Sequence, residues 1–305
     1  MNRFNETTNK GCGIVAALLL FGASLAFAHS SPSPTSDYIL LAQEEGDYDQ
    51  AFDAYGQDVD EVIEEDEAII PVDTLKAEAS GKQIKTDIDS LIRGIHWLGH
   101  AAFLIEDTVN IYIDPFDLPD GLPAADIVLI THEHSDHFSP EDLAKILKPT
   151  SILVSTGEVL KRLPKTVKHS KSTAPGDTIS VEGVSIEAVP AYNIGKDYHP
   201  KKKGYLGFII THDGRRIYHA GDTDLIPEMK HINADIAMLP VGGKFTMDAE
   251  EAAEAANLIK PKVAIPMHWG TIIGDEKDAR AFKAKTKIPV LIMEAESRPA
   301  EEGEE

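Results

Sequence analysis

The chain is best understood from residues 126–137, which read Asp126-Ile127-Val128-Leu129-Ile130-Thr131-His132-Glu133-His134-Ser135-Asp136-His137. The apolar first half is typical of a buried strand. Alternate side chains of an extended segment point to the same side, so His132 and His134 can bind one ion together. If the chain then turns into a helix near Pro140, Asp136 and His137 face a second ion. Imidazole and carboxylate ligands without thiolate suit zinc, manganese or iron, and the spacing therefore predicts a metal site at a strand end.

Outward from this stretch, short apolar runs that end in polar turns recur along the chain and predict strands. The expected strands are Ile95–Leu98, Ala102–Ile105, Asn110–Ile113, Ile127–Thr131, Ile152–Ser155, Thr178–Val181, Val184–Val189, Gly207–Thr211, Arg216–His219, Ile236–Leu239, Val263–Pro266 and Val290–Met293.

Helical patterns lie between some of these strands, over residues 140–147, 248–260 and 276–285. Pro140 suits the first turn of the first helix, and Asp248 with Glu251 has the layout of a capping box at the start of the second. A run of strands followed by strand–helix alternation in both halves predicts a sheet sandwich with helices outside.

The composition excludes several classes of protein. The chain has 305 residues, of which 42% are apolar, so it is long enough to bury a real core. Its formal net charge of −22 disfavours nucleic-acid binding, because phosphate contacts require a basic face. A single cysteine excludes a disulfide framework and a four-cysteine metal site.

Residues 1–28 have the layout of a secretory signal peptide. Arg3 and Lys10 precede an apolar run, which ends in the small-x-small pattern of Ala26 and Ala28. The alternative is an uncleaved membrane anchor, but an apolar run of 16 residues is short for a span. We therefore expect cleavage, a periplasmic or secreted protein with no stable membrane span, and loss of the lone Cys12 with the signal.

Acidic residues concentrate outside the expected folded domain, which covers residues 81–293. Residues 29–75 contain fourteen acids and no lysine or arginine, so we expect residues 29–80 to be a largely disordered tether. Residues 294–305 form an acidic tail. With +1 on the signal peptide, −14 on the tether and −5 on the tail, residues 76–293 carry only −4.

The histidine-rich hexapeptide resembles the metal-binding motif of the metallo-β-lactamase superfamily. Later segments follow in that family's order: residues 218–223 read Tyr-His-Ala-Gly-Asp-Thr, and residues 265–271 read Ile-Pro-Met-His-Trp-Gly-Thr. Residues 97–101, 114–116 and 239–248 are similar to one branch, which includes N-acyl-phosphatidylethanolamine phospholipase D and the ascorbate-6-phosphate lactonase-like metal-dependent hydrolases. The resemblance covers about residues 92–293 and implies an α/β fold, the αββα four-layer metallo-β-lactamase sandwich.

The resemblance also implies a site for two divalent metal ions, with zinc expected first and manganese or iron as alternatives. The first ion takes His132 and His134, Asp222 bridges, and the second ion takes the remaining ligands, Asp136, His137 and His268. The family's third histidine for the first ion is expected near residues 191–193, where Asn193 stands. His199 is the nearest substitute and is our prediction. The alternative leaves the first ion weakly bound, or completed by Asn193, water or substrate.

Three further residues have two interpretations each. The resemblance places His100 near the metals, and we count it with Asp222 and Asp136 as catalytic; the alternative is a structural turn. His219 either lines the site or packs in the core. Glu133 is interpreted as structural, because the HExxH motif in which such a glutamate acts as a base needs a helix and a four-residue histidine spacing.

The sequence favours metal-assisted hydrolysis of a small ester, lactone or phosphodiester. Two cations lower the pKa of a bridging water and so supply hydroxide, and Asp222 could take up its proton. Residues 201–203 and Lys244 could hold an anionic substrate, although a solvated loop is the favoured interpretation of the lysine run. Two alternatives remain: an exported metal- or partner-binding protein without turnover, which the missing histidine supports, and a nuclease, which the charge of −4 and the export signal disfavour.

Overall fold

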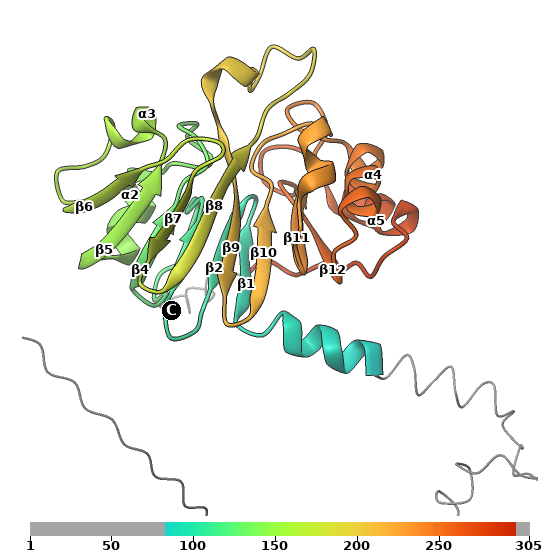
Figure 1. The fold of residues 1–305 in the computed structure, drawn as a ribbon, viewed down its shortest axis with the longest axis horizontal. Helices are drawn as coiled ribbons and strands as arrows, with labels where there is room; N and C mark the ends of the chain where they lie inside the picture. The colour runs from blue at the N-terminus through green and yellow to red at the C-terminus, as the bar shows by residue number, and fades with distance from the viewer. Residues whose placement is uncertain (1–82, 297–305) are drawn as a thin grey trace, which may run out of the picture. The chain divides into compact units, whose positions relative to one another are not determined.

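The structure is a computed structural model, and it describes residues 83–296 (Figure 1). The expected signal peptide, the tether and all but three residues of the acidic tail lie outside the described residues. Within the described part, two six-stranded sheets pack face to face. No helix of that part is long and apolar enough to span a membrane.

The first sheet follows chain order from β1 to β6. β1, β2 and β3 pair antiparallel, and β3, β4, β5 and β6 pair parallel. Its strands are β1 Ile95–Gly99, β2 Ala102–Ile105, β3 Ile111–Ile113, β4 Ala125–Leu129, β5 Leu147–Ser155 and β6 His169–Ser172.

The second sheet has the order β12-β11-β10-β9-β8-β7. β7 to β10 pair antiparallel, and β10, β11 and β12 pair parallel. Its strands are β7 Thr178–Val181, β8 Val184–Pro190, β9 Leu206–His212, β10 Arg215–His219, β11 Ile236–Pro240 and β12 Val263–Met267.

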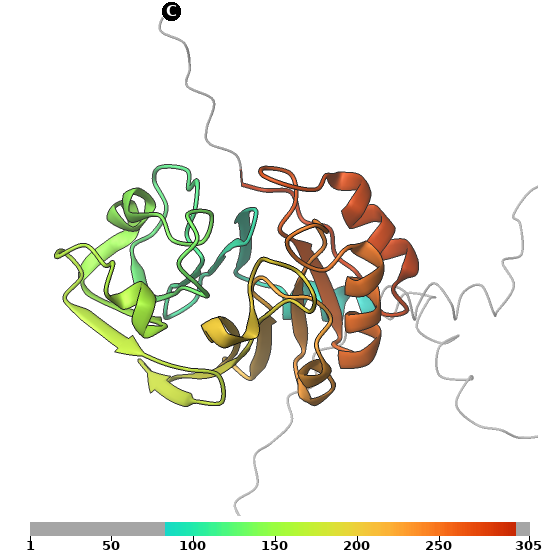
Figure 2. The same ribbon diagram turned by 90° about the horizontal axis from the view of Figure 1, so that it is seen from above.

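Helices cover both outer faces of the sandwich. α2 (Pro140–Ile146) and the one-turn α3 (Gly157–Leu160) lie on the side of the first sheet, and α4 (Ala249–Ile259) and α5 (Glu276–Lys285) lie on the second, as Figure 2 shows from above. Two short 3-10 helices, η2 (Lys201–Lys203) and η3 (Pro227–His231), and a helix over residues 83–91 complete the fold. The expected αββα sandwich is the observed architecture.

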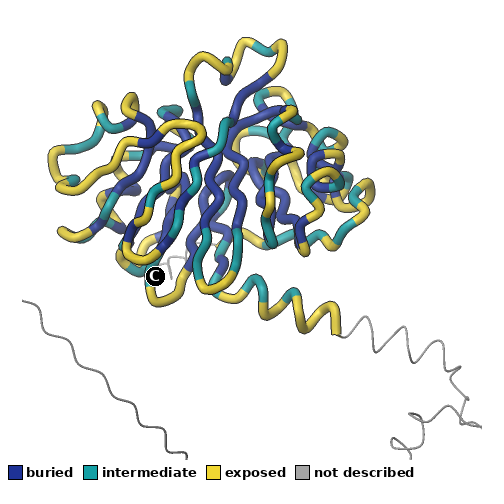
Figure 3. Tube along the Cα trace, in the orientation of Figure 1, coloured by how far each residue is buried: buried dark blue, intermediate teal, exposed yellow. Residues whose placement is uncertain are grey.

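Most strands of the sandwich, apart from the edge strands β6 and β7, are buried on both faces (Figure 3). Phe103 and Ile105 of β2 face the main core between the sheets, whereas Leu104 faces a second cluster that α2 covers with Leu143 and Ile146. Alternate residues of one strand thus serve two different layers, as the period of a β-strand requires. Near-continuous apolar runs, rather than alternating ones, are the result.

Local polarity explains where the expected and observed elements differ. β6 was not predicted, because all four of its residues are exposed and polar at a sheet edge. The prediction of a strand over Val290–Met293 is wrong. Val290 makes one isolated bridge to Ala264, and Pro289, which has no N–H, precedes it. The helix over residues 83–91 was also not predicted.

Candidate metal centre

The predicted ligands come from loops that follow strands of both sheets. His132 to His137 follow β4, Asp222 follows β10, and His268 follows β12 directly. His100 lies in the turn between β1 and β2, and His199 lies in the long connection from β8 to β9. The sheet strands therefore bring together residues that lie up to 168 positions apart in the chain.

The first group of ligand atoms consists of three histidine nitrogens. His132 Nε2 lies 3.0 Å from His134 Nδ1, and His199 Nε2 lies 3.1 Å from the same His134 atom. All three nitrogens lie within 4.8 Å of one another, which is a spacing that one metal ion can span. We call this set the trihistidine group.

The second group contains a carboxylate and three histidines. Asp136 Oδ2 lies 3.2 Å from His100 Nε2, 3.7 Å from His137 Nε2 and 3.9 Å from His268 Nε2. The four ligand atoms again lie within 4.8 Å of one another. We call this set the mixed group, and it places the predicted His100 beside Asp136.

Asp222 lies between the two groups. Its Oδ2 is 3.3 Å from His199 Nε2 and 3.1 Å from His268 Nε2, and its Oδ1 is 3.2 Å from His137 Nε2. Gly221 makes this placement possible, because it has a φ of +63° and a Cβ here would lie 2.5 Å from the Leu206 carbonyl oxygen. One carboxylate thus reaches ligand atoms of both groups.

Several buried polar atoms of this site are placed to bind a metal ion rather than to hydrogen-bond with one another. His137 Nε2, His268 Nε2 and Asp222 Oδ1 are buried and make no hydrogen bond within the described part of the chain. Buried polar atoms without partners are costly, and they are rare in folded proteins. Their lone pairs converge in a set of nitrogen and oxygen donors without sulfur, which suits a divalent cation.

Neighbouring groups fix the ring orientation of three ligands. His137 Nδ1 donates to Asp114 Oδ2 at 2.8 Å, and the backbone N–H and hydroxyl of Thr131 both donate to the same carboxylate at 2.7 Å. His132 Nδ1 in turn lies 2.9 Å from the Thr131 hydroxyl oxygen. His199 Nδ1 donates to the Phe245 carbonyl at 3.0 Å. In each ring the other nitrogen is left free to bind an ion.

The charges of the site oppose one another strongly. Burial would raise the pKa of Asp222, but His137 and His268 outweigh it and hold that pKa well below its usual range. Burial would likewise lower the pKa of His137, but the Asp222 and Asp114 carboxylates hold it well above its ordinary value. Burial lowers the pKa of both His132 and His199. The pKa shift of His137 therefore runs in the opposite direction to those of His132 and His199.

Four of the eight non-glycine residues with positive φ in the described part of the chain lie at this site. His100, Asp114, His199 and His268 have φ values of 49°, 45°, 53° and 59°, in the left-handed region that side-chain-bearing residues rarely occupy. All four are buried at the site. Such backbone strain costs on the order of 1–3 kcal/mol per residue and concentrates at functional sites.

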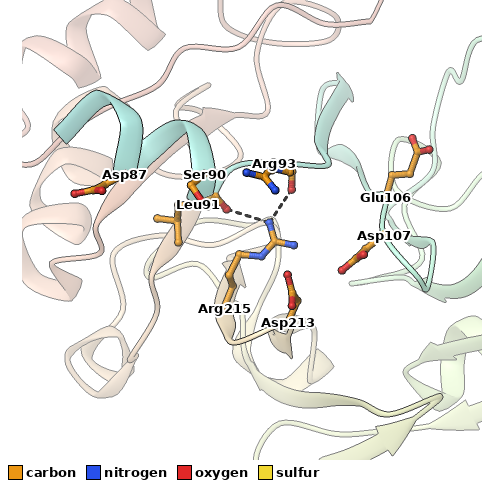
Figure 4. Close-up of a pocket in the computed structure, with 8 residues that line it drawn as sticks. All are labelled: Asp87, Ser90, Leu91, Arg93, Glu106, Asp107, Asp213 and Arg215. Carbon is orange, nitrogen blue, oxygen red and sulfur yellow. Dashed lines mark hydrogen bonds between the residues drawn. The ribbon is translucent and has the colours of Figure 1, made fainter. Parts of the chain in front are cut away.

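A cavity of about 330 Å³ opens beside the ligands. Ser135, Tyr198, Phe245 and Ile272 line it together with five ligand residues, His134, Asp136, His199, Asp222 and His268. A different cavity of about 340 Å³ lies at the start of β10 (Figure 4), where Arg215 donates to the backbone carbonyls of Leu91 and Arg93. That cavity contains none of the predicted ligands.

Comparison with known proteins decides the family. A family model of the beta-lactamase superfamily domain matches residues 94–268, more than half of the chain. The chain belongs to this superfamily. A UPF0173 metal-dependent hydrolase of Methanopyrus kandleri is 39% identical over 225 residues, which cover 66% of this chain and 96% of that protein.

Solved structures of the superfamily fold agree. The metallo hydrolase Igni18 of Ignicoccus hospitalis has a TM-score of 0.57 and 30% identity, over 67% of this chain and 95% of that one. A metal-dependent hydrolase structure from Parabacteroides distasonis has a TM-score of 0.59 and 37% identity, over 65% and 91%. The predicted superfamily, fold and metal-dependent hydrolase class are confirmed, and the predicted branch stays a prediction.

Asn193 and His199 lie in different positions relative to the other nitrogens of the trihistidine group. The Asn193 side chain donates to the Phe245 carbonyl at 2.7 Å and lies on the Nδ1 side of the His199 ring. His199 Nε2 points at His134. The geometry therefore favours His199 over Asn193 as the third nitrogen ligand.

The other ambiguous residues have structural partners. His219 is buried and donates through Nε2 to the Ala101 carbonyl at 2.9 Å, so it packs in the core behind the site. Glu133 pairs with Lys203 and accepts from the Tyr205 hydroxyl, both at 3.1 Å. The role of Asp114 was not predicted, although its position at the end of a β-branched strand was a usable signal.

Proposed function

We propose that this hydrolase holds two divalent cations and cleaves a small ester, lactone or phosphodiester. The Asp222 carboxylate is the observation that carries the proposal. It reaches His199 of the trihistidine group and both His137 and His268 of the mixed group. A single buried carboxylate between two sets of ligand atoms supports two ions that share one ligand.

Each ion would have its own set of ligands besides Asp222. His132, His134 and His199 would hold the first, and Asp136, His137 and His268 would hold the second. These donors are nitrogen and oxygen only, so zinc is the expected ion, and manganese and iron are compatible with the same set.

When bound, two divalent cations supply Lewis acidity and lower the pKa of a water that they share. The side chains of the site would hold the ions in place and accept a proton. His137 and His268 keep Asp222 as a carboxylate, which suits it to bind a cation; we also assign it the proton that the attacking water loses, an uptake that these two neighbours oppose. His100 Nε2 lies 3.2 Å from Asp136 Oδ2, and we assign it the positioning of that carboxylate.

The location of the protein and the nature of its substrate belong to the same proposal. Residues 1–28 favour export to the periplasm or outside of the cell, with no lasting membrane span after cleavage. The net charge of −22 favours a small-molecule substrate over nucleic acid.

Turnover by the full-length protein tests the proposal. Zinc-, manganese- and iron-loaded protein would be assayed with p-nitrophenyl esters, lactones and bis(p-nitrophenyl) phosphate. Asp222→Asn would be compared with Asp213→Asn, which makes the same chemical change in an exposed turn at the other end of β10. We expect turnover that Asp222→Asn abolishes and Asp213→Asn leaves intact.

The contrary outcome is equally clear. If no metal gives turnover of any of these compounds while the protein retains two ions per chain, the alternative of a binding protein without turnover replaces the proposal. If Asp222→Asn matches the wild type, the observed hydrolysis does not come from this site.

A further inference from the structure

We infer that the substrate of this site is a neutral carboxylic ester or lactone that carries an apolar group, an inference that rests on the proposed function. The wall of the 330 Å³ cavity carries it. On one side the cavity is lined by the ligands, and the rest of its lining is Ser135 with Tyr198, Phe245 and Ile272.

The three large side chains form an apolar surface. The Tyr198 and Phe245 rings meet edge to face, with centroids 4.6 Å apart and planes at 83°. This is a favourable aromatic arrangement that fixes both rings. Tyr198 lies between β8 and β9, Phe245 between β11 and α4, and Ile272 between β12 and α5, so three separate connections supply the surface.

These side chains are exposed to an unusual degree. Tyr198 is 47% exposed and Ile272 is 50% exposed, which places both among the five large exposed hydrophobic residues of the described part of the chain. A third, Ile194, lies on the same connection as Tyr198. Exposed apolar side chains that cluster around a site, rather than scatter, indicate binding of an apolar group.

Positive charge is absent from the wall. No lysine or arginine of the described residues lines the cavity. Lys201 pairs with Glu228 at 2.7 Å, and Lys203 pairs with Glu133 at 3.1 Å, so both ammonium groups already have carboxylate partners. An anionic phosphodiester would therefore find no cation there beyond the two metal ions.

Lys244 precedes Phe245 in the chain, and it does not change the argument. Its ammonium lies 4.7 Å from the centroid of the Phe245 ring, and the residue is not part of the cavity lining. Metal ions attract a carbonyl oxygen and a phosphoryl oxygen alike, so the wall has to discriminate between substrates. An apolar wall favours the compound that places carbon against it.

A chain-length series tests the inference. The full-length, metal-loaded protein would be assayed with p-nitrophenyl acetate, butyrate and hexanoate, with γ-lactones of increasing alkyl length, and with bis(p-nitrophenyl) phosphate. We expect kcat/KM to rise about threefold to fourfold for each methylene that the wall covers, the factor that burial of one CH2 group gives. We also expect the best ester or lactone to exceed the phosphodiester.

Two matched substitutions assign the effect to the wall. Ile272→Ser removes an exposed apolar side chain from the cavity lining, and Leu258→Ser makes a similar change at a 46% exposed leucine of α4 outside the lining. We expect Ile272→Ser to flatten the dependence of kcat/KM on chain length and to leave the metal content unchanged. Leu258→Ser should behave as the wild type.

Three outcomes would overturn the inference. If kcat/KM of the wild type does not depend on chain length, the substrate carries no apolar group. If the phosphodiester is cleaved preferentially, the substrate is not neutral. Both results leave the proposed hydrolase function standing. Absence of all turnover with every metal refutes the proposed function itself, and the inference falls with it.

Discussion

The trihistidine group and the mixed group share Asp222 but are held in place differently. The mixed group has a buried carboxylate, Asp114, that fixes His137 and is itself fixed by Thr131. The trihistidine group takes His199 from a connection between strands that depends on contacts with another loop. Contacts between loops are less constrained than strand ends. The comparison teaches that the mixed group is fixed next to the sheet framework, whereas the trihistidine group depends on a loop for its third nitrogen.

Removing the shared ligand should have the largest effect. We expect Asp222→Asn to lower the affinity for both ions and to reduce kcat/KM by about a thousandfold or more, because nucleophile and both ions depend on this carboxylate. Metal titration by isothermal calorimetry checks it. If only one ion is affected, Asp222 is not shared between the groups.

Loss of Asp114 should matter more for the mixed group, because Asp114 contacts His137 directly and reaches His132 only through the Thr131 hydroxyl. We expect Asp114→Asn to weaken the ion of the mixed group by about tenfold to a hundredfold, the usual effect of losing a carboxylate that orients a ligating histidine. The matched control is Asp126→Asn, which changes a carboxylate of β4 that accepts from the Asn110 backbone N–H. Equal weakening of both ions would contradict the comparison.

The affinity for metal should also depend differently on pH in the two groups. The carboxylates of Asp222 and Asp114 raise the pKa of His137, whereas burial lowers those of His132 and His199. An ion must therefore displace a proton from His137, and its affinity should fall about tenfold per pH unit as pH drops below the raised pKa. The ion of the trihistidine group should respond less steeply between pH 8 and about 7. Identical slopes, measured by competition with a chelator, would refute this.

The loop that carries His199 offers the smallest and most selective change. Lys196 Nζ lies 2.6 Å from Asp224 Oδ1 and donates to the Thr246 carbonyl at 2.8 Å, which ties this loop to the segment that contains Phe245. We expect Lys196→Met to weaken only the ion of the trihistidine group, by about tenfold, since the Lys196 side chain is partly exposed. Lys202→Met, in the same connection, is the control. An unchanged affinity would mean that the tie does not position His199.

Strand prediction placed one part of this site, and the family resemblance supplied the rest. The His132–His137 spacing follows β4 of the first sheet, whereas Asp222 and His268, which the resemblance indicated, follow β10 and β12 of the second sheet. Most strands were predicted to within one or two residues, because their apolar runs are continuous and end in polar turns. The order of strands and helices predicted a sheet sandwich with helices outside, and the resemblance identified it as the αββα four-layer fold.

Contacts between distant loops could not be predicted. Nothing local to Asp114 indicates that it would meet His137, 23 positions later, and nothing near Phe245 indicates its bond to His199. The choice of His199 over Asn193 depended on such contacts, which is why the sequence left both open. The exposed wall that Tyr198 and Ile272 form could not be predicted either, because these residues come from connections that are distant in the sequence.

Metal content tests the central claim most directly. The wild-type protein, loaded with zinc and freed of excess ion, would be measured by inductively coupled plasma mass spectrometry beside His199→Ala and the surface control His231→Ala. The account predicts two ions per chain for the wild type and for His231→Ala, and one for His199→Ala. Two ions retained by His199→Ala, or one ion in the wild type, would contradict it.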